Sequence, residues 1–520
     1  MRKRQAWKWP EQAMPDNENR LKQLQSLDIR LGAIVLSVLF SLVVIAGSPI
    51  PNDDAFSYIK AAELFNAQGL DATLSTYGWY GYSVLISLTD SLLPLNMVNS
   101  AHLVNSLSFA LLVYAFITLA MEYRQTRAIE FFAAVVILCF PTINEMRYYL
   151  VRDFAYWAFC LVALVQLIRF SKNGRLINAG GWLLAMAAAV FFRLEGLLIL
   201  ALSPFALLIP GQALDQRARK FLSLMALIFA GTLLTLLIFL LAGINLFTIF
   251  SFAYRWYLPL LAEYPDTLTG AAENTNLSIH ISEQLEAFSG KGKLVLILGY
   301  LYSVLANIGM SLGPPASLFL IYGFISGKQK LTMASKSPWL LFLGSSLLAL
   351  FLFVSIMQFL TTRYAVMTAL LLLSLMPLTL ESLYLQAKQS GKLLLFQRLL
   401  AGIVFFFLVD SLVSFGYSKQ YIQDAINWSE DNLPDNSALL TNNFAVAYYS
   451  GRVEDYDKIN KDPAETLALL SGHHYLVIDV DFDEREIHER LMANSDLSEL
   501  TRFSNRRNDA IIVYEILSSP

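Results

Sequence analysis

The sequence predicts a polytopic α-helical membrane protein with a small α/β domain at its C-terminal end. Of its 520 residues, 56% are hydrophobic and only 15% charged, at a mean hydropathy of +0.51, whereas roughly a quarter of a soluble domain is charged. The apolar residues fall into long runs, while the polar C-terminal segment alternates short strand-like and helix-like patterns. A net charge of −3 without a basic, aromatic-rich stripe argues against nucleic acid as a partner.

The apolar runs set the number of predicted spans. The run from Leu31 to Gly47 follows a polar segment too long for the start of a signal peptide, so we interpret it as an uncleaved first span. Cys139 and Cys160 lie inside later runs and are expected to be buried thiols. At about 20 residues per crossing we expect about eleven spans, near 30–48, 97–121, 128–143, 153–170, 177–192, 195–210, 219–247, 297–327, 338–359, 365–385 and 393–414.

Three segments test this number of spans. Residues 177–210 would form a helix about 51 Å long against a hydrocarbon core of about 30 Å, so we expect a turn at the charged "FRLEG", residues 192–196. Residues 82–94 are expected to lie at the membrane surface or to re-enter it. Residues 293–312 are expected to form a lead-in to the next span that breaks at "GPP", residues 313–315.

The charges of the loops orient the chain. Segments rich in Lys and Arg, such as "EYRQTR", "SKNGR" and "QAKQSGK", alternate with loops that are poorer in them, and cytoplasmic loops carry the excess. With no lipidation or retention signal recognised, we expect a bacterial inner (plasma) membrane protein with a periplasmic tail. The predicted domains are a cytoplasmic segment at 1–29, a membrane domain at 30–414 with a first outer loop at 49–96, and an outer α/β domain at 415–520.

The tail has the pattern of one modest α/β domain. Strands are expected at 437–442, 474–480 and 509–517, because each is a short apolar or alternating run next to polar residues. The acids at 479–484 are expected to form a solvated loop and helix start. Helices are expected near 418–432, at 445–451 and near 483–500.

Ionisable residues gather at the outer ends of spans that are otherwise poor in charge. A charge at mid-bilayer costs about 2.5–3.5 kcal/mol, so charges collect at helix ends for purely structural reasons as well. Their grouping on one side of the membrane nevertheless predicts a shared functional site. The residues are Asp53 and Asp54 after the first span, Arg152 and Asp153 before the fourth, Arg193 and Glu195 in "FRLEG", and Arg363 and Tyr364 before the tenth.

A helix is predicted directly after the acidic pair. In "PNDDAFSYIKAAELFNAQG", Asn52 or Asp53 is placed to cap the helix, and Gly69 is placed to end it. Only one carboxylate of the pair is needed for capping. The other is a candidate general base.

Together these positions resemble those of a known family, the polyprenyl-phosphate-sugar-dependent glycosyltransferases of the integral-membrane C class (GT-C). This class includes protein O-mannosyltransferases and bacterial lipid A aminoarabinose transferases, and many of its members have an outer α/β tail. This chain departs from the pattern in having Asp-Asp where Asp-Glu is common. The matching residues are Asp53 and Asp54, Tyr58 and Gly69 in the helix that follows, Asp153 after Arg152, the "FRLEG" turn, and the pair Arg363 and Tyr364.

The resemblance implies an inverting enzyme that moves a hexosyl or pentosyl group from a polyprenyl-phosphate donor to a lipid, glycan or protein acceptor outside the cytoplasm. It implies that Asp53 or Asp54 deprotonates or orients the acceptor. Asp153 is a third catalytic candidate, which could orient the acceptor or pair with an arginine. Donor phosphate would be bound by Arg152, Arg193 and Arg363, and further substrate contacts would come from Tyr58, Glu195 and Tyr364.

No cofactor is assigned with certainty. Asp53, Asp54 and Asp153 would be the ligands if a divalent cation such as Mg²⁺ or Mn²⁺ took part. The aromatic residues of the loop 249–292 are expected at the bilayer interface. The alternative function is a transporter or flippase of lipid-linked saccharides, which would be expected to place polar groups near the midplane on broken helices. A silent scaffold is a third possibility.

Overall fold

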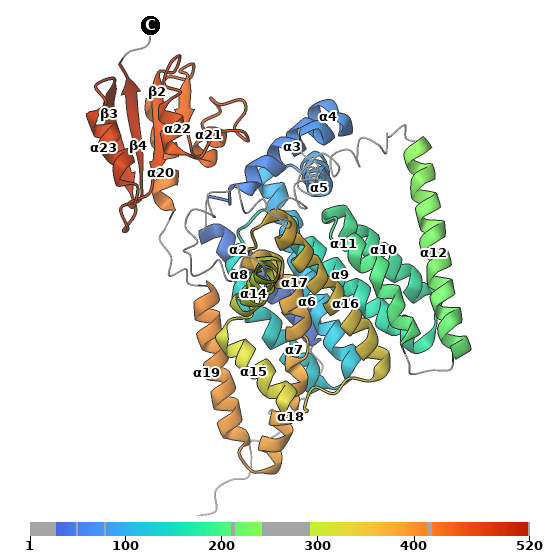
Figure 1. Ribbon diagram of the computed structural model, residues 1–520. Helices are drawn as coiled ribbons and strands as arrows, with labels where there is room; N and C mark the ends of the chain where they lie inside the picture. The colour runs from blue at the N-terminus through green and yellow to red at the C-terminus, as the bar shows by residue number, and fades with distance from the viewer. Residues whose placement is uncertain are drawn as a thin grey trace, which may run out of the picture.

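A bundle of helices and a small α/β domain make up the molecule in the computed structural model (Figure 1), which describes residues 28–47, 50–76, 80–209, 214–241, 292–412 and 419–517. The loop 249–291 and the segment 1–27 lie outside the described residues, so the expectations for them stay predictions. The longer helices are α2 (Ile29–Gly47), α6 (Met97–Tyr123), α9 (Asp153–Asn173), α10 (Leu176–Phe192), α12 (Leu214–Leu241), α14 (Gly292–Leu312), α16 (Met333–Met357) and α19 (Leu393–Leu412).

Shorter helices complete this part of the chain. Within the described residues, six helical stretches are long and apolar enough to cross a bilayer, or seven with the bent pair α14–α15, which identifies a multi-pass membrane protein. Over its described residues, every predicted span coincides with a helix or a helix pair. However, α10, α19 and the pair α11–η1 are shorter apolar helices, and α7 has only 12 residues. The shorter elements are α3 (Asp54–Gln68), α4 (Leu70–Thr76), α5 (Tyr80–Leu92), α7 (Arg127–Leu138), α8 (Pro141–Glu145), α11 (Gly196–Leu202), η1 (Ser203–Leu208), α15 (Pro314–Ile325), α17 (Thr362–Leu373) and α18 (Met376–Gln389).

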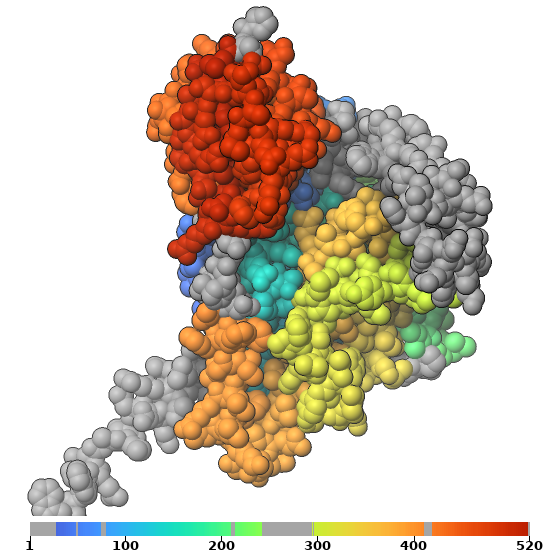
Figure 2. All heavy atoms as spheres, turned by 60° about the vertical axis from the view of Figure 1, so that its left-hand side comes forward, coloured from blue at the N-terminus to red at the C-terminus, as the bar shows by residue number. Residues whose placement is uncertain are grey.

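The centre of the bundle is α9, which packs against α6, α10 and α16. Its Trp157 is 1% exposed, and Trp182 of α10 is fully buried. In contrast, α12 exposes large apolar side chains such as Phe229 and Leu240 along its length, as expected where a helix faces lipid. Figure 2 shows α14, α15 and α19 on another face of the molecule, below the tail domain.

The predicted turn at "FRLEG" and the predicted break at "GPP" are both confirmed. Helix α10 ends at Arg193 and α11 begins at Gly196, so "FRLEG" is a turn. A side chain at Gly196 would meet the backbone nitrogen of Val190 at 3.1 Å, which explains the glycine at this close approach. Helices α14 and α15 meet at an angle of 103° at Gly313, whose φ is +74°.

The predicted capping of α3 is wrong, although its predicted end is confirmed. Asp53 occupies the N-cap position but its side chain makes no capping hydrogen bond. Asn52 instead accepts a hydrogen bond from the backbone N–H of Leu150 at 2.7 Å. Both side chains are drawn to partners distant in the sequence, and backbone carbonyls close the first turn. Gly69, with a φ of +83°, ends the helix.

The tail domain, residues 419–517, contains a four-stranded sheet in the order β1-β2-β4-β3. Strands β1 and β2 are parallel, and β4 runs antiparallel to both β2 and β3. The helix predicted near 483–500 is wrong at its C-terminal end, because residues 497–504 pair with β4 as a strand. The elements are α20 (Gln420–Asn432), β1 (Leu439–Thr441), α21 (Phe444–Tyr449), α22 (Pro463–Leu467), β2 (Tyr475–Val480), α23 (Arg485–Ala493), β3 (Leu497–Ser504) and β4 (Ala510–Ile516).

The tail domain docks on α3 (Figure 1). The fully buried ring of Phe56 lies 6.3 Å from that of Phe444 and 5.5 Å from that of Tyr448, both in α21. Polar contacts surround these rings, since Tyr456 donates a hydrogen bond to Glu63 at 2.7 Å. The helix that begins at Asp54 is therefore held between the bundle and the tail.

Candidate functional site

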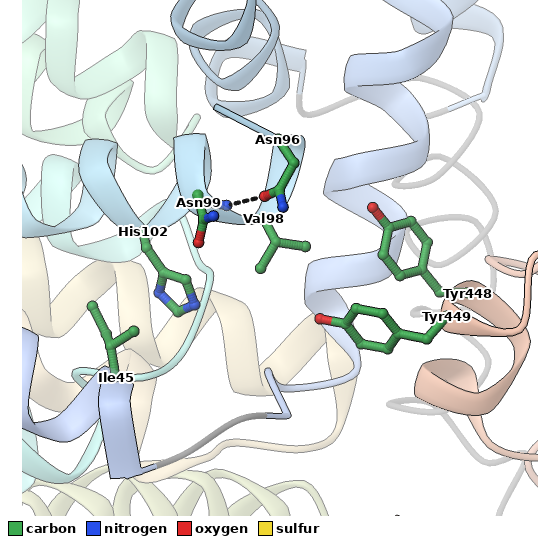
Figure 3. Close-up of a pocket in the computed structure, with 7 residues that line it drawn as sticks. All are labelled: Ile45, Asn96, Val98, Asn99, His102, Tyr448 and Tyr449. Atoms are coloured by element: carbon green, nitrogen blue, oxygen red, sulfur yellow. Dashed lines mark hydrogen bonds between the residues drawn. The ribbon is translucent and has the colours of Figure 1, made fainter. Parts of the chain in front are cut away.

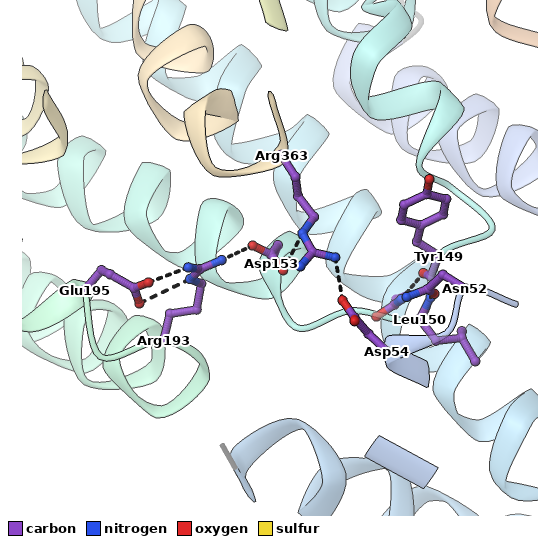
Figure 4. A network of polar contacts seen from close by, with 9 residues as sticks. Asn52, Asp54, Tyr149, Leu150, Asp153, Arg193, Glu195 and Arg363 are labelled. Atoms are coloured by element: carbon purple, nitrogen blue, oxygen red, sulfur yellow. Dashed lines mark hydrogen bonds and ion pairs between the residues drawn. The ribbon is translucent and has the colours of Figure 1, made fainter. Parts of the chain in front are cut away.

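Five ionisable side chains form a continuous network at the end of the bundle that faces the tail (Figure 4). Arg363 donates to Asp54 at 2.8 Å, and its Nε lies 4.0 Å from the carboxylate of Asp153. Asp153 also pairs with Arg193, whose guanidinium in turn binds both carboxylate oxygens of Glu195. Negative and positive groups thus alternate from Asp54 to Glu195.

Each member of this network is placed by the end of a helix. Asp54 and Asp153 are the first residues of α3 and α9, where the helix dipole favours a negative charge. Arg193 and Glu195 flank the turn between α10 and α11, and Arg363 lies in the first turn of α17. Helix ends from four distant parts of the sequence therefore meet at one place.

Burial divides the network into a closed half and an open half. The side chains of Asp153 and Arg193 are 2% and 6% exposed, whereas those of Arg363 and Asp54 are 21% and 48% exposed. A buried charge is tolerated only when it is paired and hydrogen-bonded, as the inner pair is. A substrate can reach the Arg363–Asp54 pair without unfolding any part of the protein.

Aromatic rings cover the arginines. The ring of Tyr364 lies 4.9 Å from the guanidinium carbon of Arg193 and 5.4 Å from that of Arg363, within the range of cation–π attraction. Tyr156 of α9 adds a second ring at 5.8 Å from Arg193. These contacts fix the planes of both guanidinium groups.

The other predicted site residues have different surroundings. Tyr58 is 3% exposed and packs edge-to-face on Tyr82 at 5.1 Å, so it lies in the core beneath the acidic pair. Arg152 immediately precedes α9 and lies within electrostatic range of Glu195. Asp53 is exposed and forms an ion pair with Lys461 of the tail domain.

Sequence reasoning missed three residues that contact the site. Lys461 contacts Asp53 from 408 positions away in the chain, and no motif marks it. The sequence indicates only a capping role for Asn52, whereas its side chain accepts a hydrogen bond from Leu150 in the segment before α9 and so connects that segment to the acidic loop. Tyr156 follows Asp153 at helical spacing, which is the one signal that could have identified it.

The acidic residues of the site face basic side chains. Asp54 and Asp153 face arginines and Asp53 faces a lysine. Within the described part of the chain, no group of three or more His, Cys, Asp and Glu side chains is arranged to hold a metal ion. Participation of Mg²⁺ or Mn²⁺ at Asp53, Asp54 and Asp153 stays a prediction.

A cavity of about 530 Å³ lies beside α3, between the ends of the spans and the tail domain (Figure 3). The hydroxyl groups of Tyr448 and Tyr449 reach towards it from α21, and His102 of α6 faces it from the bundle. The remaining lining residues are Ile45, Asn96, Val98 and Asn99.

Comparison with known proteins identifies the fold. No protein-family model and no curated protein matches the chain. The crystal structure of ArnT from Cupriavidus metallidurans in the apo state matches with a TM-score of 0.50 at 11% identity, over 96% of this chain and 99% of that one. ArnT bound to undecaprenyl phosphate matches with a TM-score of 0.45 at 12% identity, over 94% and 97%.

The Archaeoglobus fulgidus oligosaccharyltransferase, tethered to an acceptor peptide with the NVT sequon, is also similar. Its TM-score is 0.43 at 13% identity, over 83% of this chain, and this chain spans 60% of its length. The likeness to apo ArnT, which extends over nearly the whole of both chains, shows that this protein has a GT-C fold with a small C-terminal α/β domain.

Proposed function

We propose that the protein is an inverting glycosyltransferase that moves a sugar from a polyprenyl-phosphate donor to an acceptor outside the cytoplasm. The supporting observation is the guanidinium of Arg363, which faces Asp54 at 2.8 Å and Asp153 at 4.0 Å where the network opens to solvent. A carboxylate to take a proton and a guanidinium to receive a phosphate are the groups that this reaction needs. The GT-C fold is independent support.

Asp54 is the proposed general base. The acceptor oxygen attacks the anomeric carbon from the face opposite the phosphate, so that a new C–O bond forms as the bond from that carbon to the phosphate oxygen breaks. The acceptor proton passes to Asp54, and the electron pair of the broken bond stays on the polyprenyl phosphate. General-base catalysis typically contributes about 10²–10⁴ in rate. Asp53 is the alternative base, since its side chain is about as exposed as that of Asp54. Its carboxylate faces Lys461.

Donor binding prepares this base. In the structure Arg363 donates a hydrogen bond to the Asp54 carboxylate, so this carboxylate has a protein partner before the donor binds. A phosphate offers Arg363 a competing partner for strong, bidentate hydrogen bonds. Once the phosphate takes over the guanidinium, Asp54 is released for the acceptor, and Arg363 stabilises the charge that develops on the leaving group.

The buried half of the network positions the open half. The Asp153 carboxylate lies 4.0 Å from the Nε of Arg363 on the buried side. Asp153 is itself paired with Arg193, which in turn pairs with Glu195. The guanidinium of Arg193 is buried between two carboxylates, which supports a positioning role for it in place of the phosphate binding implied by the family resemblance. Tyr364 lies against both arginines, which supports its place beside the substrate.

We also propose that the site and the tail domain lie on the periplasmic side of a bacterial inner membrane. The opposite end of the bundle carries Arg124, Arg169 and Lys172, which pair with Glu381 within α18 and with Glu122 at the end of α6. This concentration of basic residues supports a cytoplasmic location for that end.

The test is reconstitution of the full-length protein in vesicles with polyprenyl-phosphate sugars and a cell-envelope acceptor extract. Asp54→Asn is expected to lower the rate of sugar transfer by about 10²–10⁴, and Arg363→Ala by a similar factor because the leaving phosphate loses its cation. Mass spectrometry of the acceptor measures transfer.

Asp71→Asn is the matched control, because Asp71 is an exposed aspartate of the neighbouring helix α4. It is expected to retain the full rate. Full transfer by folded Asp54→Asn and Asp53→Asn variants would overturn the proposal. Movement of the lipid-linked sugar across the vesicle membrane without any transfer would identify a flippase instead.

A further inference from the structure

A second cavity, of about 390 Å³, joins the tail domain to the proposed active site. Asp53 and Ile50 line it from the membrane part, and Lys461 and Asn443 are among the residues that line it from the tail. Because Asp53 belongs to both the cavity wall and the acidic pair beside Arg363, a ligand in this cavity would lie next to the proposed catalytic groups.

The cavity occupies the position where α/β sheets commonly bind ligands. Asn443 follows the carboxyl end of β1, and Asp481 follows the carboxyl end of the parallel strand β2. Ligands of open α/β sheets bind in the crevice outside the carboxyl ends of parallel strands. The parallel arrangement of β1 and β2 therefore explains why a cavity lies at this edge of the sheet.

The chemistry of the walls favours a ligand with many hydroxyl groups. Side-chain amides and carboxylates both line the cavity, and the Asn443 amide donates to Asp479 at 2.7 Å. Burial raises the pKa of the Asp479 carboxyl to about 6, and this group also accepts a hydrogen bond from the hydroxyl of Tyr421. The ring of Phe444 adds an apolar surface beside Lys461, whose Nζ lies 5.5 Å from the ring centroid.

The charge of the walls selects against anions. Five carboxylates and two lysines line the cavity, namely Asp53, Asp479, Asp481, Glu484 and Asp509 against Lys419 and Lys461. Hydroxyl and ammonium groups can donate hydrogen bonds to such walls, whereas a phosphate would meet an excess of negative charge.

We propose that this cavity binds the acceptor, and that the acceptor's terminal group is an uncharged or amine-bearing saccharide rather than a phosphorylated one. The inference rests on the proposed function, because it makes the cavity the acceptor half of a two-part site. The donor lies on the Arg363 side of the acidic pair and the acceptor on the tail side. Lys461, paired with Asp53 on the shared wall, positions the acidic loop between the two halves.

Saturation-transfer difference NMR on the full-length protein in nanodiscs tests this proposal, with glucose, glucosamine and glucose 1-phosphate as probes. Glucose and glucosamine are expected to bind, with glucosamine the tighter, and glucose 1-phosphate is expected to bind at least about tenfold more weakly than glucosamine because it adds a repulsive charge and lacks the ammonium group. Asp481→Lys is expected to weaken glucosamine binding by about tenfold or more and to strengthen binding of glucose 1-phosphate.

Asp496→Lys is the matched control, since Asp496 is an exposed aspartate of the same domain that does not line the cavity. It should leave the binding of all three probes unchanged. The proposal is overturned if neither glucose nor glucosamine binds more than to empty nanodiscs, if glucose 1-phosphate binds as well as glucosamine, or if Asp481→Lys behaves like Asp496→Lys.

A second measurement separates this inference from the proposed function. Hydrolysis of the donor by water, measured without any acceptor, depends on the ion-pair network, so Arg363→Ala should lower its rate and Asp496→Lys should leave the rate unchanged. Loss of probe binding with normal donor hydrolysis supports an acceptor cavity. If Asp54→Asn and Asp53→Asn both retain full transfer, the proposed function fails, while sugar binding by the tail is still measured directly.

Discussion

Arg193 and Arg363 show how burial gives one residue type two different tasks. The side chain of Arg193 is 6% exposed and is enclosed by Asp153 and Glu195, whereas that of Arg363 is 21% exposed and shares its charge between two carboxylates. Each nitrogen of the Arg193 guanidinium already donates to a protein carboxylate, and its burial leaves little of it exposed to a substrate. The exposed one can exchange a protein carboxylate for a phosphate, as the proposed reaction requires.

The first residue-scale prediction concerns the enclosed arginine. Arg193→Met should lower the free energy of unfolding by about 3–5 kcal/mol, because it leaves the buried carboxylate of Asp153 without its closest partner. Thermal unfolding of the detergent-solubilised protein measures the change. The double variant Asp153→Asn with Arg193→Met should recover part of the loss, since position 153 then no longer carries an unpaired buried charge.

The control for this prediction is Arg490→Met in the tail. Arg490 pairs with Glu486 on an exposed helix face, with side chains 57% and 76% exposed, and such pairs contribute about 0.3–0.5 kcal/mol. Equal destabilisation by Arg193→Met and Arg490→Met would show that the buried network does not support the fold.

Among the elements, α5 packs very closely against α10. Its Gly81 contacts the backbone of α10 so closely that a side chain there would overlap the carbonyl oxygen and ring of Phe191. Tyr82 and Ile86 of the same helix are fully buried. Helix α5 packs against α3 as well, so its position controls where the acidic loop lies relative to the "FRLEG" turn.

The element-scale prediction is therefore that Gly81→Ala displaces α5 from α10. Overpacking of this kind costs about 1–3 kcal/mol, and the rate of sugar transfer should fall because α3 moves with α5. Unfolding temperature and transfer rate measure the two effects. Gly180→Ala in α10 is the control, since a side chain there meets no atom within 4 Å and alanine favours the helix. A Gly81→Ala protein as stable and active as Gly180→Ala would show that the close contact at Gly81 does not set the position of α5.

At the scale of the whole molecule, the tail domain and the membrane part act as one unit. Phe56 inserts between rings of α21, Tyr456 binds Glu63, and Lys461 binds Asp53. Each of these contacts reaches α3 or the acidic residue before it. The tail therefore fixes the position of the proposed catalytic loop as well as lining the acceptor cavity.

Phe56→Ala tests this coupling. Truncation of a fully buried phenylalanine removes about 3–5 kcal/mol of packing, so hydrogen exchange of α3 and α21 should quicken together while that of α9 stays unchanged. Mass spectrometry of the full-length protein measures the exchange. Phe482→Ala is the control, because that ring is 43% exposed. Faster exchange in α3 alone would show that the tail does not hold the loop.

The sequence by itself determined the class of protein, most of the helices, most of the tail, the turn at "FRLEG" and the break at "GPP". These follow from hydrophobic runs, periodicity and the local conformations of glycine and proline, which depend on near neighbours in the chain. It also identified Asp54, Asp153, Arg193 and Arg363 as residues of interest, because charges at the ends of apolar helices are costly enough to be informative.

Only the tertiary structure decided which charges pair and which remain accessible. Asn52 and Asp53 do not cap α3, because their side chains contact Leu150 and Lys461 instead. Residues 497–504 form a strand because they pair with β4. Arg193 was enclosed and Arg363 left open by the packing of α9, α10 and α17. Burial and long-range contacts arise when distant segments meet, and no local pattern in the chain encodes the partner that each segment will find.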